Sequence, residues 1–501
     1  MSGRGEFDQW QDRLGRRRTD FVDVLPDELW VKIFKNSMAD GPAQVAKNSY
    51  ALRSFRRVTN PFLLNSVCKE WRRICKAHAE VWDTVFMAFA WMDGETKEMI
   101  KAFKQRVNAL GLWMLRAGTR TISLTYRIIE TDYFPFDNSN AMGLPRIVAY
   151  HARRIKYLDC VVSSTWYNIF KRVPFPVLEK LKFICGDYAE HIAGDGGYPF
   201  GHDYCRWTQD SVLDLAGSCS KLTTVWLEAS FSSIGLMLPW DQIVDIEVGH
   251  VERALAIEIL ERLPNLRRCK MAMVPYVTDD DWMQSPDNHG RFEGRGRVTA
   301  TALETLALRT LAPSAFGDIL GIAPLSLKGI DVHNFNEPPL DEGLVLDPLL
   351  PFASTLETLS IGFCSPLDTD QLVAALSQLN AIVSLTIAFG DQAEPLDDGF
   401  MRSVLTTPGV LPRLQRVFVA TSDLWIGDDA LLKFLRYRGH ANANGDSVSC
   451  ERIREVRLGL MEGAVAPRLQ LETVAELGRM VANGLQFRIE HVTGQLERVE
   501  E

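Results

Sequence analysis

A six-residue pattern, apolar at its first, fourth and sixth positions, recurs along most of the chain. Ten clear copies begin at residues 178, 222, 243, 266, 303, 327, 356, 382, 414 and 453, and two weaker copies begin at 119 and 155. Apolar residues at the fourth and sixth positions are the alternation of a short strand with one buried face. Because the same short strand returns so often, the pattern predicts a stack of similar units rather than a fold around one central core.

The spacing of the copies and the segments between them predict the architecture. Successive copies are 21 to 44 residues apart, and the shorter spacings match the leucine-rich repeat. Amphipathic stretches such as Glu252–Leu263, Thr369–Leu379 and Asp428–Arg436 follow several copies, so each unit reads as strand, loop and helix. We therefore expect an α/β fold, a curved solenoid over residues 119–501 with parallel strands on one face and helices on the other. The repeats are irregular and lack a regular Asn at the turn.

Strand alternation divides each unit between core and solvent. Positions four and six should point into the core, and positions three, five and seven should face outward. The charged residues at these outward positions are Lys180, Lys182, Arg268, Lys270, Arg309, Arg416, Arg457, Asp159, Glu228, Asp245, Glu247, Asp331 and Glu455. Neither sign dominates, so the basic stripe of a nucleic-acid-binding surface is missing and a protein ligand is favoured.

Two aromatic residues stand at outward positions, where a large ring contributes little to the core. Trp226 and Phe418 both occupy position five of their copies. Exposed aromatics on a repeat face are candidate anchors for a bound protein. The alternative is that a neighbouring loop covers each ring. Both interpretations stay open from the sequence.

The N-terminal part has a different pattern, of short helices. Pro26 suits a first helical position, with acidic residues following in the first turn, and Leu29, Ile33 and Phe34 share one face. A second helix is expected from Pro61, because apolar residues from there recur at three- and four-residue spacing: Leu64, Val67, Cys68, Trp71, Ile74 and Cys75. Helices this short need a neighbour to pack against.

These residues resemble an F-box. The resemblance covers about residues 21–89 and rests on the run Leu25-Pro26-Asp27-Glu28-Leu29, on the segment from Val67 to Ile74 with its Val-Cys-x-x-Trp-Arg centre, and on the later Val81-Trp82. The long gap from Phe34 to Val67 departs from the compact family pattern and reads as an inserted loop, of the sort seen in fungal F-box-like proteins. A generic helical cap on the following domain would show similar spacing.

The resemblance implies partners and contact residues. An F-box docks on a Skp-type adaptor, which bridges it to a cullin scaffold. The residues that the resemblance assigns to the adaptor, by contact or by packing the helices that make it, are Leu25, Pro26, Leu29, Ile33, Phe34, Leu64, Val67, Cys68, Trp71 and Trp82. Residues 21–89 hold ten Lys and Arg against seven Asp and Glu, which suits an acidic partner, whereas the whole chain has a net charge of −9.

Composition and local patterns bound the remaining function classes. The chain is 46% hydrophobic, and its longest apolar run, Val85 to Met92, is far shorter than the ~20 residues of a membrane helix. We expect a protein of the cytoplasm or nucleus, with no membrane contact and with its nine cysteines reduced. The expected organisation is a flexible tail (1–20), an F-box-like helical domain (21–89), a helical linker or cap (90–118) and the repeats (119–501).

Candidate metal and catalytic groups are weak. Cys185, His191, His202 and Cys205 have a spacing that matches no standard zinc site, and adjacent acids at Asp279, Asp280 and Asp281 need not converge. Gly294 and Gly296 lack the strand-to-helix context of a phosphate loop. We expect no metal and no cofactor, and we expect the insertions 185–207, 275–299 and 437–450 to be mobile.

Three functions remain in view. The favoured one is the non-catalytic substrate-recognition subunit of an SCF-type cullin ubiquitin ligase, in which the F-box binds the Skp-type adaptor and the repeats bind a protein substrate. The second is a leucine-rich-repeat scaffold that acts outside a ligase. The third is an enzyme whose site lies in the insertions. A repeat surface carries no transferable code for its substrate.

Overall fold

The structure is a computed structural model. It describes residues 25–47, 61–90, 97–129, 143–162, 167–170, 173–185, 213–215, 217–228, 236–251, 253–273, 302–310, 317, 319–321, 323, 326–334, 346–363, 369–389, 409–421, 428–440, 450–461 and 469–492. The chain forms two compact units, Met1–Pro239 and Trp240–Glu501, and each is described by itself.

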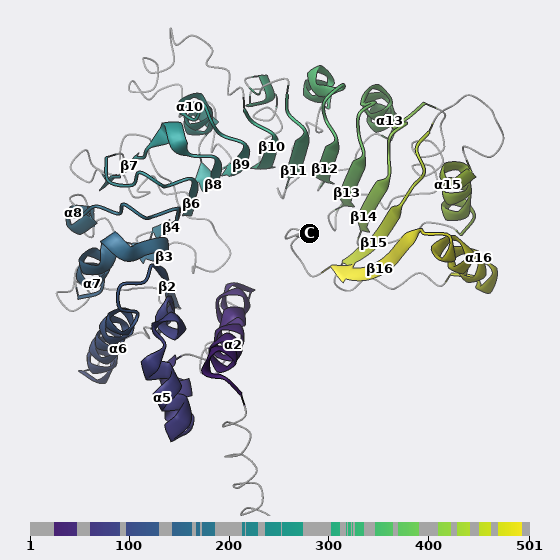
Figure 1. Ribbon diagram of the computed structural model, residues 1–501. Coiled ribbons are helices and arrows are strands. Elements are labelled where there is room, and N and C mark those ends of the chain that lie inside the picture. The colour runs from purple at the N-terminus through teal and green to yellow at the C-terminus, as the bar shows by residue number, and fades with distance from the viewer. Residues whose placement is uncertain are drawn as a thin grey trace, which may run out of the picture. The chain divides into compact units, whose positions relative to one another are not determined.

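The first unit begins with four helical elements that precede its sheet. They are α2 (Asp27–Lys47), α4 (Pro61–Val67), α5 (Lys69–Ala77) and the 3-10 helix η1 (Ala79–Trp82) (Figure 1). Part of the expected inserted loop is thus helical, because α2 continues to Lys47. The prediction of a single helix from Pro61 is also wrong, because the helix is interrupted at Cys68. The backbone of Cys68 is extended, and its Sγ accepts a hydrogen bond from the Trp71 amide at 3.4 Å.

The sheet of the first unit has five parallel strands in chain order. They are β1 (Thr84–Ala90), β2 (Ile122–Ile129), β3 (Ile155–Val162), β4 (Lys180–Cys185) and β6 (Thr224–Glu228). Between them lie α6 (Lys97–Arg116), α7 (Gly143–His151), η2 (Ala152–Arg154) and α8 (Tyr167–Phe170). A separate pair joins β5 (Leu213–Asp214) and β7 (Leu236–Met237). The parallel order requires each connection to return the chain to the start of the next strand, and α6, α7 and α8 lie in three of these connections.

The second unit repeats this arrangement over nine parallel strands. They are β8 (Asp245–Val251), β9 (Arg268–Met273), β10 (Thr305–Thr310), β11 (Gly329–Asn334), β12 (Thr358–Phe363), β13 (Ser384–Phe389), β14 (Arg416–Thr421), β15 (Glu455–Met461) and β16 (Gln486–Val492). The helical segments are η6 (Trp240–Gln242), α10 (Arg253–Arg262), η7 (Asp347–Phe352), α13 (Thr369–Gln378), α15 (Asp428–His440) and α16 (Leu471–Ala482).

The repeated motif coincides with this sheet. Each of the twelve copies falls on a strand, and every side chain at its fourth and sixth positions is buried. The amphipathic stretches form α10, α13 and α15, as predicted. The predicted fold class, α/β with parallel strands and helices, is therefore confirmed. The motif did not predict β1 and β16, nor the separate pair of β5 and β7.

A backbone ladder explains why irregular spacing does not disturb the sheet. At the second motif position the N–H of one unit donates to the carbonyl of the preceding unit, as in Glu304 to Arg267 at 2.8 Å, Lys328 to Glu304 at 2.9 Å and Glu357 to Lys328 at 2.7 Å. These bonds fix where each strand starts, whatever length of chain precedes it. Insertions therefore change the connections and leave the strand register intact.

The expected insertions are only partly described. Residues 437–440 belong to α15 rather than to an insertion, and Arg438 there is fully buried. Residues 186–207, 275–299 and 441–449, like the tail 1–20, lie outside the described residues. Of the helices that the structure describes, none combines the length and the apolarity needed to cross a bilayer.

Candidate functional site

Two aromatic clusters support the N-terminal helices. The ring of Trp71 on α5 lies 5.5 Å from Trp30 and 4.8 Å from Phe34, both on α2. Trp82 lies edge-on to Phe62 of α4 at 5.4 Å, and its indole N–H donates to the Cys75 carbonyl. These rings are the main apolar contacts joining the helices, so they set the angles between them.

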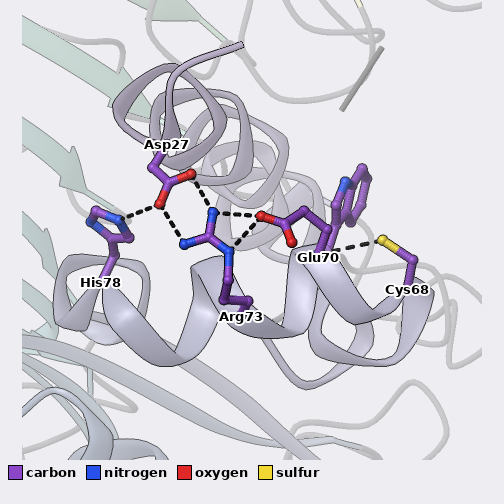
Figure 2. A network of polar contacts seen from close by, with 6 residues as sticks. Asp27, Cys68, Glu70, Arg73 and His78 are labelled. Carbon is purple, nitrogen blue, oxygen red and sulfur yellow. Dashed lines mark hydrogen bonds and ion pairs between the residues drawn. The ribbon is translucent and has the colours of Figure 1, made fainter. Parts of the chain in front are cut away.

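A polar network joins the start of α2 to α5 on the surface (Figure 2). The Arg73 guanidinium donates to both carboxylate oxygens of Asp27, at 2.9 and 2.6 Å, and to Glu70 at 2.5 Å. His78 Nε2 lies 3.4 Å from Asp27. Hydrogen bonding to Arg73 lowers the pKa of Asp27 below its usual value. A bidentate pair of this kind holds one helix orientation better than a single contact does.

Four apolar side chains on α2 and α4 remain exposed beside these clusters. Leu29 and Ile33 on α2 are 42% and 44% exposed, and Leu63 and Val67 on α4 are 48% and 56% exposed. Each pair is spaced by four residues, so its members lie on one side of their helix. Leu63 was not among the predicted site residues, although its four-residue spacing from Val67 was a signal that could have found it.

The predicted adaptor residues divide by exposure. Pro26, Leu29, Ile33 and Val67 are exposed, and Leu25, Cys68 and Trp71 are partly buried. Phe34, Leu64 and Trp82 are buried, at 1%, 5% and 1% exposure. The first two groups have surface to offer a partner, whereas the third packs the helices that carry that surface.

The outward strand faces hold charges that pair with each other. Asp245 contacts Arg268 at 2.9 Å and Glu247 contacts Lys270 at 2.6 Å, both between β8 and β9. Glu455 and Arg457 pair within β15 at 2.5 Å. These contacts cancel charge locally, which agrees with the mixed signs seen in the sequence.

Outward orientation does not always mean exposure, so that expectation needs correction. Asp159 and Lys182, at fifth positions, and His333, at a seventh, are only 4%, 7% and 6% exposed. Parallel strands bring equivalent positions into direct register, as Asp159 with Lys182, so long neighbours lie over one another.

The two candidate aromatic anchors are half-buried rather than open. Trp226 is in register with Lys182, whose ammonium lies over the indole ring. Phe418 lies between Thr386 and Arg457 of the adjacent strands. Trp226 belongs to the first unit and Phe418 to the second. Each ring therefore has a partly covered face and is a candidate contact in its own unit.

One constellation on the second unit resembles a catalytic set but lacks its geometry. Asp331 Oδ1 lies 2.6 Å from His333 Nε2, and Ser360 Oγ lies 3.5 Å from the same nitrogen. A relay needs the acid and the nucleophile on different ring nitrogens. The burial and polar contacts here instead hold the ring in one place against Gly362.

Other chemistry-bearing groups do not converge in the part of the chain that the structure describes. There, no three His, Cys, Asp or Glu side chains gather as a metal site. Cys185 ends β4, while His191, His202, Cys205, Asp279, Asp280, Asp281, Gly294 and Gly296 lie outside the described residues. Burial raises the pKa of Cys75 and of Cys219 to about 11, which keeps both thiols protonated.

Comparisons with known proteins leave the family open. No protein-family model matches the chain, and no curated protein matches it. Among solved structures, the crystal structure of a Bacteroides fragilis protein matches 56% of this chain and 68% of its own, with 12% sequence identity and a TM-score of 0.28.

Proposed function

We propose that this chain is the substrate-recognition subunit of an SCF-type cullin ubiquitin ligase and has no catalytic activity of its own. In this proposal residues 21–89 are an F-box that binds a Skp-type adaptor, and the adaptor links the chain to a cullin. The observation that carries the proposal is the pair of exposed apolar positions on α2, Leu29 and Ile33, directly beside a buried aromatic cluster.

The burial pattern supports a docking role for α2. Trp30, Phe34 and Met38 face the protein and are buried, whereas Leu29 and Ile33 leave more than two fifths of their surface uncovered. Apolar side chains held in place before binding lose little conformational freedom when a partner covers them. The bidentate contact of Arg73 with Asp27 holds α2 in that position. The helix therefore presents its apolar pair in a fixed orientation.

Charge on α5 supports an acidic partner. Lys69, Arg72 and Lys76 are exposed on this helix. Arg73 is exposed too, but Asp27 and Glu70 neutralise it. Exposed cations around an apolar contact steer an acidic partner and raise its association rate. This is the surface that binding to an acidic adaptor requires.

The repeats supply the second half of the proposal. We assign the strand and helix units to a leucine-rich-repeat-like solenoid, supported by the agreement of twelve motif copies with twelve strands. The outward strand faces bind the protein substrate, with Trp226 and Phe418 as contacts. A leucine-rich-repeat scaffold outside a ligase would share this surface but would not bind the adaptor.

The test compares two double variants, each of which replaces two exposed apolar side chains on one helix. Leu29→Ser/Ile33→Ser alters the proposed docking surface, and Leu112→Ser/Leu115→Ser alters an exposed pair on α6, 50% and 67% exposed. Each full-length variant is co-expressed with a Skp-type adaptor, and the copurified adaptor is quantified. We expect the α2 variant to retain less than about a tenth of the wild-type amount, and the α6 variant to match wild type.

Two outcomes would contradict the proposal. Undiminished adaptor with the α2 variant would exclude this surface, and no adaptor with the wild-type chain would favour the scaffold. Circular dichroism of both variants shows whether they are folded.

A further inference from the structure

Strand β16 is the last strand in the parallel sheet of the second unit, and no described strand pairs with its outer edge. In Figure 1 it is the yellow strand after β15, with α16 beside it, and it pairs with β15 alone. Ile489 is in register with the core residue Leu458, yet Ile489 is 39% exposed whereas Leu458 is 1% exposed. The core of this unit is therefore open at β16.

The backbone of β16 is arranged to accept another strand. The Gln486 N–H donates to the Arg454 carbonyl at 2.8 Å, which directs the even-numbered residues of β16 toward β15. Because backbone groups alternate along a strand, those of Phe487, Ile489 and His491 point to the free edge. These three alternate residues therefore direct backbone donors and acceptors to an edge with which no described strand pairs.

We propose that two copies of this chain associate through β16, with the two strands antiparallel and Ile489 on the two-fold axis. In that register Ile489 faces its own copy as a hydrogen-bonded pair, and Phe487 faces His491. Arg488 then faces Glu490 of the other copy in a non-hydrogen-bonded pair, where side chains approach most closely. The charges are thus self-complementary, and the contact occurs twice in the dimer.

The charged residues of β16 are available for this contact. Arg488 is exposed and Glu490 partly so, and neither forms an ion pair with another described residue. Within the chain, Arg488 lies next to Arg457, whose charge is already paired with Glu455. A second copy places a carboxylate directly opposite Arg488, where the chain's own sheet places Arg457. This charge match favours a second copy over an unrelated strand.

Helix α16 supports the same two-fold arrangement. Leu471, Val474 and Val481 are exposed on it, and Gly478 completes their spacing of three, four and three residues, which is the seam of a helix pair. A Cβ at Gly478 would meet nothing within 4 Å, so a neighbouring helix has room to approach. In an antiparallel pair of α16 helices, Leu471 meets Val481 and exposed Glu472 meets exposed Arg479. The apolar residues and the charged residues of α16 are therefore both complementary to those of a second, antiparallel copy.

Sedimentation velocity of the full 501-residue chain over a range of concentrations tests this proposal. We expect a concentration-dependent dimer. Arg488→Glu and Glu490→Arg should each weaken it by about tenfold or more, because each places like charges opposite one another twice. The double variant Arg488→Glu/Glu490→Arg should restore the dimer to within about threefold. Lys328→Glu, an exposed reversal before β11, should leave it unchanged.

A backbone variant gives a second, independent measurement. Ile489→Pro removes an N–H that faces the free edge and makes no bond to β15, so the chain should stay folded by circular dichroism yet become monomeric. A monomeric wild-type chain would overturn the proposal. If the wild-type chain is monomeric and removal of residues 493–501 produces a dimer, the edge of β16 is assigned to that segment instead. A dimer insensitive to both charge reversals would also overturn it.

Discussion

The buried guanidinium of Arg438 donates a hydrogen bond to the main-chain oxygen of Leu411 at 3.0 Å, and Leu411 is the one described non-glycine residue with a positive φ, 48°. A second bond runs from Arg438 to the Val410 carbonyl at 2.6 Å. A left-handed conformation costs a leucine about 1 to 2 kcal/mol. The side chain of Arg438, on α15, therefore fixes the turn that leads into β14.

Removing Arg438 should destabilise the second unit strongly. Arg438→Ala removes the donor to the Val410 carbonyl and one of the two donors to the Leu411 carbonyl, which keeps its bond from the Leu414 amide, and it opens a cavity. We therefore expect a loss of about 3 to 5 kcal/mol in the free energy of unfolding. Arg436→Ala on the same helix is the matched control, because Arg436 is 52% exposed and pairs with Glu476 on the surface. It should cost about 1 kcal/mol or less. Chemical denaturation measures both, and equal losses would contradict this role.

Gly362 is required by the buried ring of His333. A Cβ at Gly362 would overlap His333 Nδ1, and the ring is held by Asp331 and Ser360 and cannot easily move away. We expect Gly362→Ala to cost about 1 to 3 kcal/mol. Gly217→Ala, where a Cβ meets nothing within 4 Å, should be nearly neutral. An unchanged melting temperature of Gly362→Ala would contradict this, because it would show that the His333 ring can move to another position.

The repeated units could be predicted from the sequence because one physical rule governs them. Alternation at the fourth and sixth positions marks burial, and it located twelve strands. Strand β1 also has the apolar spacing, with Trp82 first, Val85 fourth and Met87 sixth, but Trp82 was assigned to the F-box resemblance instead. Strand β16 was not predicted because Gly484 occupies its first position, where each of the ten clear copies has a buried apolar residue.

Stability should fall in mild acid through His151. Burial lowers the pKa of His151 to about 4, and the nearby Arg154 guanidinium adds to the effect. The folded chain therefore keeps this ring neutral, while the unfolded chain takes up a proton near pH 6.5. The stabilisation is present above pH 6.5 and is lost as the pH falls toward 4. We expect His151→Gln to reduce the fall in melting temperature between pH 7.5 and pH 5, and an unchanged fall would contradict the assignment.

Substitution of Trp226 and Phe418 distinguishes a substrate-binding role of these rings from a packing role. Both rings are half-buried, so Trp226→Ala and Phe418→Ala should each cost less than the about 3 to 5 kcal/mol of a fully buried ring. If the rings are substrate contacts, each variant should capture less of the proteins that the wild-type chain captures from a lysate, compared at equal folded protein. A lower melting temperature with unchanged capture would assign the rings to packing.

The candidate docking surface was harder to foresee than the repeats. Leu29 and Phe34 belong to the same apolar pattern of α2, yet one is 42% exposed and the other 1% exposed. The spacing of apolar residues defines one face of a helix. How much of that face is buried depends on the neighbouring elements, here Trp71 of α5. The pairing of Arg73 with Asp27 across 46 residues likewise has no local sequence signal.

The most direct test of the central claim is the affinity of the wild-type full-length chain for a purified Skp-type adaptor, measured by isothermal titration calorimetry. The account predicts one-to-one binding with a dissociation constant of about 1 µM or tighter, and a loss of about 1.4 kcal/mol or more in binding free energy for Leu29→Ser/Ile33→Ser. The α6 control, Leu112→Ser/Leu115→Ser, should bind as wild type does. Absence of binding by the folded wild-type chain, or equal affinity of the α2 variant, would contradict the account.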